Sequence, residues 1–324
     1  MDALVRFSFY CFTAASIAMV ASAMCYIAYA VGRVQVRQTA GQTSAGTTFV
    51  GHGAQAGPQS IDIARFGTML ASGWAPTRSP APQSIAIARF GTMLAWFALA
   101  FQGLSVLLRT IAAGRVPLSN MYEFSSTFLV ILLVIYIVFE RTYGVRQLGA
   151  IVLPLAAGMA AYIWSLPAAM REIDPLIPAL QSITIMTIHV GLALLAYSTF
   201  AVAFAAAALF LVASHWRVTW LPSPDLLDDF GFRAVTIGFP ALSLVLIVGS
   251  IWAHQAWGAY WSWDPKETAA LFTWLIYAVY LHTRTLRGWR GNRGAWILVF
   301  GFAAAIFTYY GNYFFGGLHA YGGI

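Results

Sequence analysis

The sequence predicts an all-α integral membrane protein with about eight transmembrane helices. Of its 324 residues, 60% are hydrophobic and only 9% are charged, and the mean hydropathy is +0.72. Long apolar runs recur along the chain, and a run of about 20 apolar residues is enough to cross the hydrocarbon core of a bilayer. This composition lies well outside the range of soluble globular domains. The net charge of +7 therefore bears on membrane orientation and does not indicate a nucleic-acid partner.

The first segment, residues 1–31, is predicted to be an anchored transmembrane helix. Its apolar run covers about 7–31, which is too long for a simple secretory signal peptide, and no small-residue cleavage site with soluble sequence after it is present. The two cysteines of the chain, Cys11 and Cys25, both lie in this run and form no Cys-x-x-Cys pair. We expect them to be small packing residues without a redox role.

Residues 32–86 have the composition of a flexible linker, rich in Gly, Ser, Thr, Gln, Ala and Pro. Residues 58–71 recur as residues 82–95 with a single difference, Asp62 against Ala86. The first copy runs into Ser-Gly-Trp-Ala-Pro and is too short to cross a membrane, whereas the second copy opens an apolar run. We interpret the repeat as a local tandem duplication, and His52 is expected to be solvated and inert.

Residues 87–324 are predicted to form the main transmembrane domain. Seven further spans are expected at about 87–108, 121–139, 147–164, 184–213, 232–252, 268–284 and 294–312. With the first helix, they place successive loops on alternating sides of the membrane.

Arginines concentrate on one of these two sides. The loops after the first, third, fifth and seventh spans contain Arg33, Arg37, Arg141, Arg146, Arg217, Arg233, Arg284, Arg287, Arg290 and Arg293. The opposite side carries Arg6, Arg109, Arg115, Arg171 and Lys266. Because positive residues are enriched in cytoplasmic loops, the first side is predicted to be cytoplasmic. Both termini, the 165–183 loop and the segment 252–267 are then predicted to lie outside the cytoplasm.

Aromatic residues gather in the segment 252–267, which we call the Trp-rich hinge. Four of the twelve tryptophans lie between positions 252 and 263, together with a tyrosine, and the only lysine of the chain follows them. These residues are Trp252, Trp257, Tyr260, Trp261, Trp263 and Lys266. One interpretation is an aromatic belt at the membrane interface. The other is a platform for a large planar ligand.

The order of residues in the hinge favours the second interpretation. The run Trp-Gly-Ala-Tyr-Trp-Ser-Trp-Asp-Pro-Lys-Glu, residues 257–267, resembles the tryptophan-rich WWD signature of membrane haem-handling proteins, which include the CcsA/ResC, CcmC and CcmF families. Its Asp-Pro-Lys-Glu ending is similar to CcsA/ResC, the membrane half of the system II cytochrome c synthase. The resemblance covers about 115–324 and does not extend to 1–85. It implies that the hinge binds haem b through its aromatic residues.

Three histidines are the candidate haem-iron ligands. The residues before His189, and Gly-Leu-His-Ala-Tyr-Gly around His319, resemble the two external haem-ligand motifs of CcsA. His282 resembles the intramembrane ligand of the family, whose partner ligand comes from the companion ResB/CcsB protein. Paired neutral imidazoles are what a six-coordinate haem iron requires. From the residues alone, His282 could equally form a hydrogen bond between helices. His254 and His215 match no ligand motif.

Charged residues near two predicted helix N-termini could serve as helix caps, as functional residues, or as both. Asp264 at the N-cap, Pro265 and Glu267 form a capping arrangement for the span that follows. Asn120 and Glu123 do the same for the third span. Capping is compatible with ligand binding, since a helix start beside Lys266 attracts anions such as haem propionates. Asp264 and Lys266 are therefore candidate haem-binding residues as well. Glu123 is a further candidate, because Pro117-Leu-Ser-Asn-Met-Tyr-Glu123 also resembles a motif of the family.

The resemblance implies a cytochrome c biogenesis protein that carries haem across the membrane. It implies haem presentation for thioether attachment to the Cys-x-x-Cys-His motif of apocytochrome c, as the membrane subunit of a holocytochrome c synthase. The implied partners are a ResB/CcsB-type protein, apocytochrome c, a thioredoxin-like thiol reductant and membrane lipid. The implied location is the bacterial plasma membrane, with the thylakoid membrane as the alternative. The chain itself shows no pairing of a nucleophile with a base.

Two alternatives of function remain open. One is a haem exporter of the CcmC type that forms no thioether bonds, which the Asp-Pro-Lys-Glu ending disfavours. The other is a secondary transporter or a b-type cytochrome. A transporter is expected to show paired broken helices or repeat symmetry. A b-type cytochrome needs two iron ligands at the same depth in the membrane. On the inner side this sequence offers only one deep histidine, His282.

Overall fold

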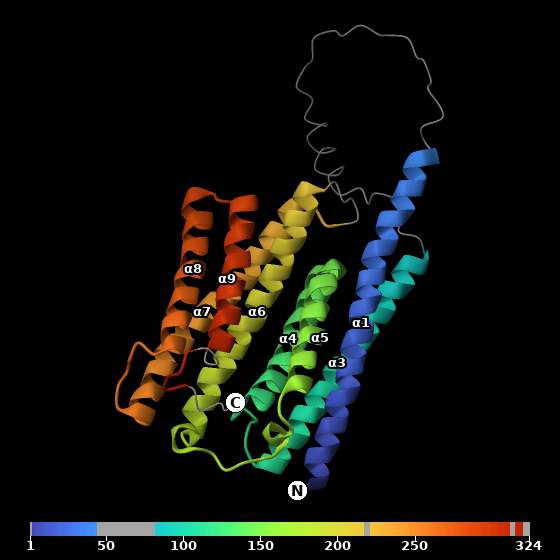
Figure 1. Ribbon diagram of the computed structural model, residues 1–324. Helices are drawn as coiled ribbons and strands as arrows, with labels where there is room; N and C mark the ends of the chain where they lie inside the picture. Colours follow the sequence, from blue (N-terminus) through green and yellow to red (C-terminus); the bar gives the residue numbers. More distant parts are fainter. Residues whose placement is uncertain (1, 44–81, 217–220, 312–314, 320–324) are drawn as a thin grey trace, which may run out of the picture.

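The computed structural model describes residues 2–43, 82–216, 221–311 and 315–319, and within these ranges it is helical without strands. Long helices run alternately up and down through an elongated bundle (Figure 1). They are α1 (Asp2–Thr43), α3 (Pro82–Ala113), α4 (Met121–Tyr143), α5 (Gly149–Ser165), α6 (Ile183–His215), α7 (Pro224–Trp257), α8 (Pro265–Arg287) and α9 (Asn292–Tyr310). His52 and the first repeat copy, 58–71, lie outside the described residues.

Seven of these helices are long and apolar enough to cross a membrane, so the chain is a multi-span membrane protein and the all-α prediction is confirmed. The exception is α8, predicted as the span 268–284. It has 23 residues and runs beside α9 (Figure 1), but its middle contains polar and aromatic side chains. Among these, Thr273, Tyr277 and Tyr280 are fully buried. Its less apolar groups therefore face the bundle.

The bounds of two helices differ from the predicted ones. Helix α1 continues to Thr43, and α3 begins at Pro82, so both enter the predicted linker 32–86. No proline interrupts 32–43, and nothing there blocks the i to i−4 hydrogen bonds of a helix. Pro82 occupies the first position of α3, where its missing N–H has no helical partner to lose. The second repeat copy, 82–95, is thus the first part of α3.

The bundle is assembled around α6 and α4. Helix α6 packs on α7 and α9, α4 connects to α3, α5 and α6, and α1 packs on α3 and α5. The buried middle of α6 is rich in alanine, including residues 201, 203 and 205–207. Small residues let membrane helices approach closely, where bilayer lipids give little hydrophobic driving force for association.

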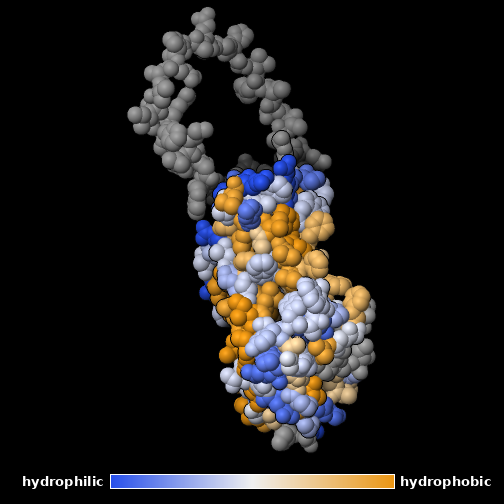
Figure 2. All heavy atoms as spheres, turned by 90° about the vertical axis from the view of Figure 1, so that its left-hand side faces the viewer, coloured by the Kyte–Doolittle hydropathy of each residue, from blue (hydrophilic) through white to orange (hydrophobic). Residues whose placement is uncertain are grey.

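Successive connections between the helices lie at opposite ends of the bundle, in the alternating order that the sequence predicts. The N-terminus of α1 lies at one end with the α3–α4 and α5–α6 connections and the Trp-rich hinge (Figure 1). The α4–α5 and α8–α9 connections lie at the other end, which carries most arginines. Figure 2 shows hydrophilic residues gathered at that upper end and apolar residues along the flank below it. The cytoplasmic assignment of the Arg-rich end stays a prediction.

Candidate functional site

The Trp-rich hinge turns the chain between two long helices. Gly258 ends α7 with φ 81, and its N–H donates to the His254 carbonyl at 2.9 Å. Asp264 begins α8 as its N-cap, and Glu267 completes a capping box by accepting from the Asp264 N–H. The predicted caps at Asp264 and at Asn120 are both present. The hinge is therefore held from both sides by helix ends.

A cavity of about 150 Å³ lies beside the hinge. It brings together His189 of α6, Trp252 of α7, Trp261 and Lys266 of the hinge, and His319 after α9. Pockets for small molecules usually measure about 300–1,000 Å³. A planar ligand the size of a porphyrin must therefore project from the cavity. At its mouth lies Tyr260, whose side chain is 58% exposed.

His189 is fixed in one orientation by its surroundings. Its ring lies parallel to that of Trp252, with centroids 5.9 Å apart, and its Nδ1 is 3.0 Å from the Val245 carbonyl oxygen. A carbonyl can only accept, so Nδ1 carries the proton and Nε2 carries the lone pair. A Cβ on Gly249 would lie 2.5 Å from the His189 ring, so only glycine leaves room for it.

His319 also lies against Trp252, and a carboxylate fixes its ring. Its Nδ1 lies 2.8 Å from Asp264 Oδ2, and its ring centroid lies 4.8 Å from that of Trp257 and 5.7 Å from that of Trp252. Asp264 Oδ1 also accepts from the Leu318 N–H at 2.6 Å. A Cβ on Gly317 would lie 2.3 Å from Asp264 Oδ1, so the glycine permits this close approach.

The protonation states of this pair suit metal coordination by the imidazole. Burial lowers the pKa of His319 although the hydrogen bond to Asp264 opposes the shift. Burial raises the pKa of Asp264, but the hydrogen bonds from His319 and from the Lys266 and Leu318 amides outweigh it and lower that pKa to about 2. At neutral pH the ionised carboxylate accepts a hydrogen bond from the Nδ1–H of a neutral imidazole. Nε2 of His319 then carries the lone pair.

The remaining hinge residues divide into cavity lining and surroundings. Tyr260, Trp261 and Lys266 line the cavity. Trp257 contacts His319 without lining it. Trp263 is 69% exposed with φ 58, a backbone conformation unfavourable for a bulky residue, and its ring meets that of Trp261 edge-on at 5.7 Å. The indole of Trp263 is therefore displayed on the surface.

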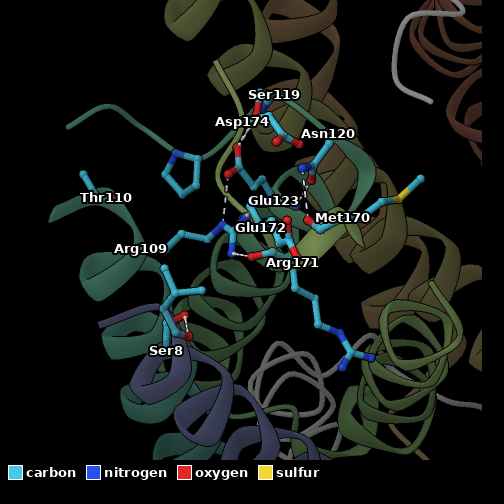
Figure 3. A network of polar contacts seen from close by, with 12 residues as sticks. Ser8, Arg109, Thr110, Ser119, Asn120, Glu123, Met170, Arg171, Glu172 and Asp174 are labelled. Atoms are coloured by element: carbon cyan, nitrogen blue, oxygen red, sulfur yellow. Dashed lines mark hydrogen bonds and ion pairs between the residues drawn. The ribbon is translucent and has the colours of Figure 1, made fainter. Parts of the chain in front are cut away.

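Glu123 lies outside the cavity lining, in a buried polar cluster (Figure 3). Its carboxylate pairs with Arg109 Nε and Arg115 Nη1, each at 2.9 Å, and is fully buried. Arg109 also donates to the carbonyls of Arg171 and Glu172 at 2.7 and 2.9 Å. The cluster ties the α3–α4 connection to the segment 168–174. Glu123 therefore positions the adjacent segment of the polypeptide, in which residues 118–121 and 124 line the cavity.

The other histidines lie apart from the two in the cavity. His282 is exposed on α8, toward the Arg-rich end. The ring of His254 stacks on that of Tyr260 at 4.2 Å outside the cavity lining, and that of His215 lies 6.3 Å from Trp216. Among the described histidines, the structure thus brings together His189 and His319 of the three predicted ligands.

Several residues of the site carried no signal in the sequence. The Val245 carbonyl is a backbone group that no side-chain pattern reveals. Gly249 is one glycine in an apolar helix, where it has many possible explanations. Met186 and Tyr309 line the cavity from runs whose composition predicts only membrane spans.

Comparison with known proteins agrees with these observations. The family model described as cytochrome C assembly protein matches residues 118–319. The cytochrome c biogenesis protein CcsA of Chlamydomonas reinhardtii is 39% identical over 228 residues, covering 68% of this chain and 64% of that protein. CcsA of Synechococcus elongatus is 34% identical over 282 residues, covering 70% of this chain and 86% of that protein.

A likeness in fold extends to a solved structure. The chain matches the structure of the cytochrome c haem lyase CcmF with a TM-score of 0.62 and 14% sequence identity over 94% of this chain. It spans 46% of the CcmF chain, and the match to the Chlamydomonas protein also covers less than two thirds of that relative. At this identity the CcmF match shows a shared helical fold.

Proposed function

The chain belongs to the CcsA family of cytochrome c assembly proteins, and we propose that it binds haem b at the hinge and presents it for covalent attachment to apocytochrome c. One observation carries the proposal. His189 and His319 line one cavity with Trp252, and each has its Nδ1 engaged by an oxygen acceptor. Two imidazoles that line one cavity and have their Nδ1 atoms engaged would be suited to bind a haem iron through Nε2.

The other residues of the cavity fit the same group. Trp252 and Trp261 line the cavity and offer aromatic surface to a porphyrin, while Trp257 supports the His319 ring. The ammonium group of Lys266 at the α8 N-terminus suits a propionate. The bound haem supplies vinyl groups, across which the two Cys-x-x-Cys-His thiols add as S–H to form thioethers. The protein contributes orientation and exclusion of water. A haem held by His189 and His319 would fit into this cavity only in part and would keep an edge accessible to the apocytochrome.

His282 is proposed as an earlier position on the haem route. Its ring is exposed on α8, so a companion membrane protein of the ResB/CcsB type can approach it and provide the second ligand. A thioredoxin-like reductant keeps the apocytochrome thiols reduced. We propose the bacterial plasma membrane as the location, with the thylakoid membrane as the alternative.

The proposal is tested by purifying the full chain with and without the companion protein and assaying pyridine haemochrome. We expect extractable haem b with a low-spin bis-histidine spectrum, and conversion of added apocytochrome to the covalent form by the pair. Haem binding without conversion under reducing conditions would favour the CcmC-type exporter. The absence of haem in both preparations would contradict the haem site itself.

The orientation gives a separate prediction. A reporter that is active only outside the cytoplasm is expected to work after Ile324 or within 253–260, because positive-inside bias places these positions outside. It is expected to fail within 286–293, where arginines cluster. Activity within 286–293, with the fusion protein intact in the membrane, would reverse the orientation and the assignment of the hinge to the outer face.

Gly249→Ala tests whether the position of His189 matters. The new methyl group would lie 2.5 Å from the imidazole, so the ring must leave its place beside Trp252. We expect loss of the low-spin haem spectrum by about 10-fold or more, as for other groups that orient ligands. Gly191→Ala on α6 is the matched control, since its added Cβ meets no atom within 4 Å. Equal haem spectra in the two variants would show that His189 need not be held there.

A further inference from the structure

A second cavity, of about 540 Å³, lies at the Arg-rich end of the bundle, between α3 and α4. Its lining includes Arg89 and Thr92 of α3, Arg141 of α4, and Arg146 in the turn after α4. The cavity lies at the opposite end of the bundle from the Trp-rich hinge, which joins α7 to α8 (Figure 1). Arg89 and Thr92 belong to the second copy of the sequence repeat, so the duplicated motif supplies one wall.

The charges around this cavity do not balance. Three arginines line it against one carboxylate, Glu140. That carboxylate already accepts from Tyr26 at 2.9 Å and from Thr92 at 2.7 Å, as well as from Tyr136. It pairs with Arg146 Nε at 3.6 Å. Among the described residues, no other carboxylate forms an ion pair with these arginines, so the cavity keeps an excess of positive charge.

An exposed apolar face of α3 adjoins the cavity. Below Arg89, α3 presents Phe90, Met93, Trp96 and Phe97 outward, each between 42% and 51% exposed. The Arg141 guanidinium lies 5.3 Å from the centroid of the Trp96 ring, an arrangement typical of a membrane interface. Guanidinium groups bind phosphate oxygens with paired hydrogen bonds. A phosphate between the arginines would leave acyl chains free to follow the apolar side of α3.

We propose that this cavity binds the phosphate headgroup of an anionic phospholipid. Cavity, charge and apolar flank all point to an anionic amphiphile. Basic pockets between membrane helices on the cytoplasmic side bind such headgroups, and the predicted orientation places this end in that anionic leaflet. The inference stands apart from the proposed haem site, with which the cavity shares no residue.

The test uses the full chain reconstituted into vesicles of phosphatidylcholine with or without phosphatidylglycerol, then analysed by native mass spectrometry. Arg141→Gln and Arg146→Gln are each expected to weaken phosphatidylglycerol retention about fivefold, since each basic residue near a membrane surface contributes on that scale. Arg287→Gln and Arg290→Gln are matched controls, because both side chains are exposed at the same end and neither lines the cavity. The controls are expected to retain wild-type lipid binding.

Two outcomes would overturn the proposal. If the cavity variants and the control variants lose phosphatidylglycerol equally, the lipid is attracted by the overall positive charge of this end of the bundle and not by the cavity. Displacement of the lipid by inorganic phosphate in the wild-type protein would make the cavity a site for the free anion. Haem content is measured in the same samples. Cavity variants that lose the lipid but keep wild-type haem content would show that the two sites are independent.

Discussion

Replacing His189 or His319 with glycine is expected to abolish cytochrome c assembly. Each change removes one imidazole from the cavity and leaves a space that free imidazole fills. The expected loss is at least about 100-fold, because removing an iron ligand exceeds the 10- to 100-fold cost of losing a group that only orients one. Added imidazole should restore part of the activity and of the low-spin spectrum. The measurement is haem-stained mature cytochrome c together with the haem spectrum of the purified variant.

Controls separate iron ligation from other effects. Glycine inside a helix costs about 1 kcal/mol, so the level of the His189→Gly protein must be followed in parallel. His215→Ala is expected to change nothing, since that ring lies beside Trp216 away from the cavity. Trp261→Ala should lower haem content without imidazole rescue. Wild-type assembly and spectra in both glycine variants would remove the two-ligand site and favour the aromatic-belt interpretation of the hinge.

Asp264→Asn is expected to lower haem binding and cytochrome c assembly by about 10- to 100-fold. The carboxylate accepts on one oxygen from His319 and Lys266 N and on the other from Leu318 N. An asparagine amide turns one of these acceptors into a donor. Either the contact with Leu318 fails, or His319 receives a hydrogen bond at Nδ1, which moves its proton to Nε2 and removes the lone pair meant for iron.

The fold of the Asp264→Asn variant should survive, because asparagine is a good N-cap. Ser223→Ala, at the N-cap of α7, is the matched control for a loss of capping alone, which costs about 1 kcal/mol. It should leave the haem spectrum unchanged. Thermal stability near wild type with a weakened spectrum in Asp264→Asn would support the orienting role. A wild-type spectrum in that variant would assign Asp264 to capping only.

Features that depend only on residue type and order along the chain could be predicted from the sequence. Apolar runs predicted the helices, and Asp264 with Glu267 predicted a cap that the structure contains. Helix α8 is less apolar than the other long helices because its polar and aromatic residues are buried against the bundle. The hydropathy of one helix does not show which of its residues face other helices. The separation of Glu123 from the cavity depends on Arg109 and Arg115, whose contacts arise only once α3 and α4 pack together.

The two imidazoles of the site are held by different kinds of support. His189 belongs to α6 and is oriented by the backbone carbonyl of Val245 in α7. His319 follows α9 and is tied to the hinge because the Asp264 carboxylate accepts from its ring and from the Leu318 N–H. One ligand position therefore depends on how two helices pack, and the other depends on a single side chain. A change at Asp264 is then expected to displace His319 and to leave His189 in place while the bundle stays folded.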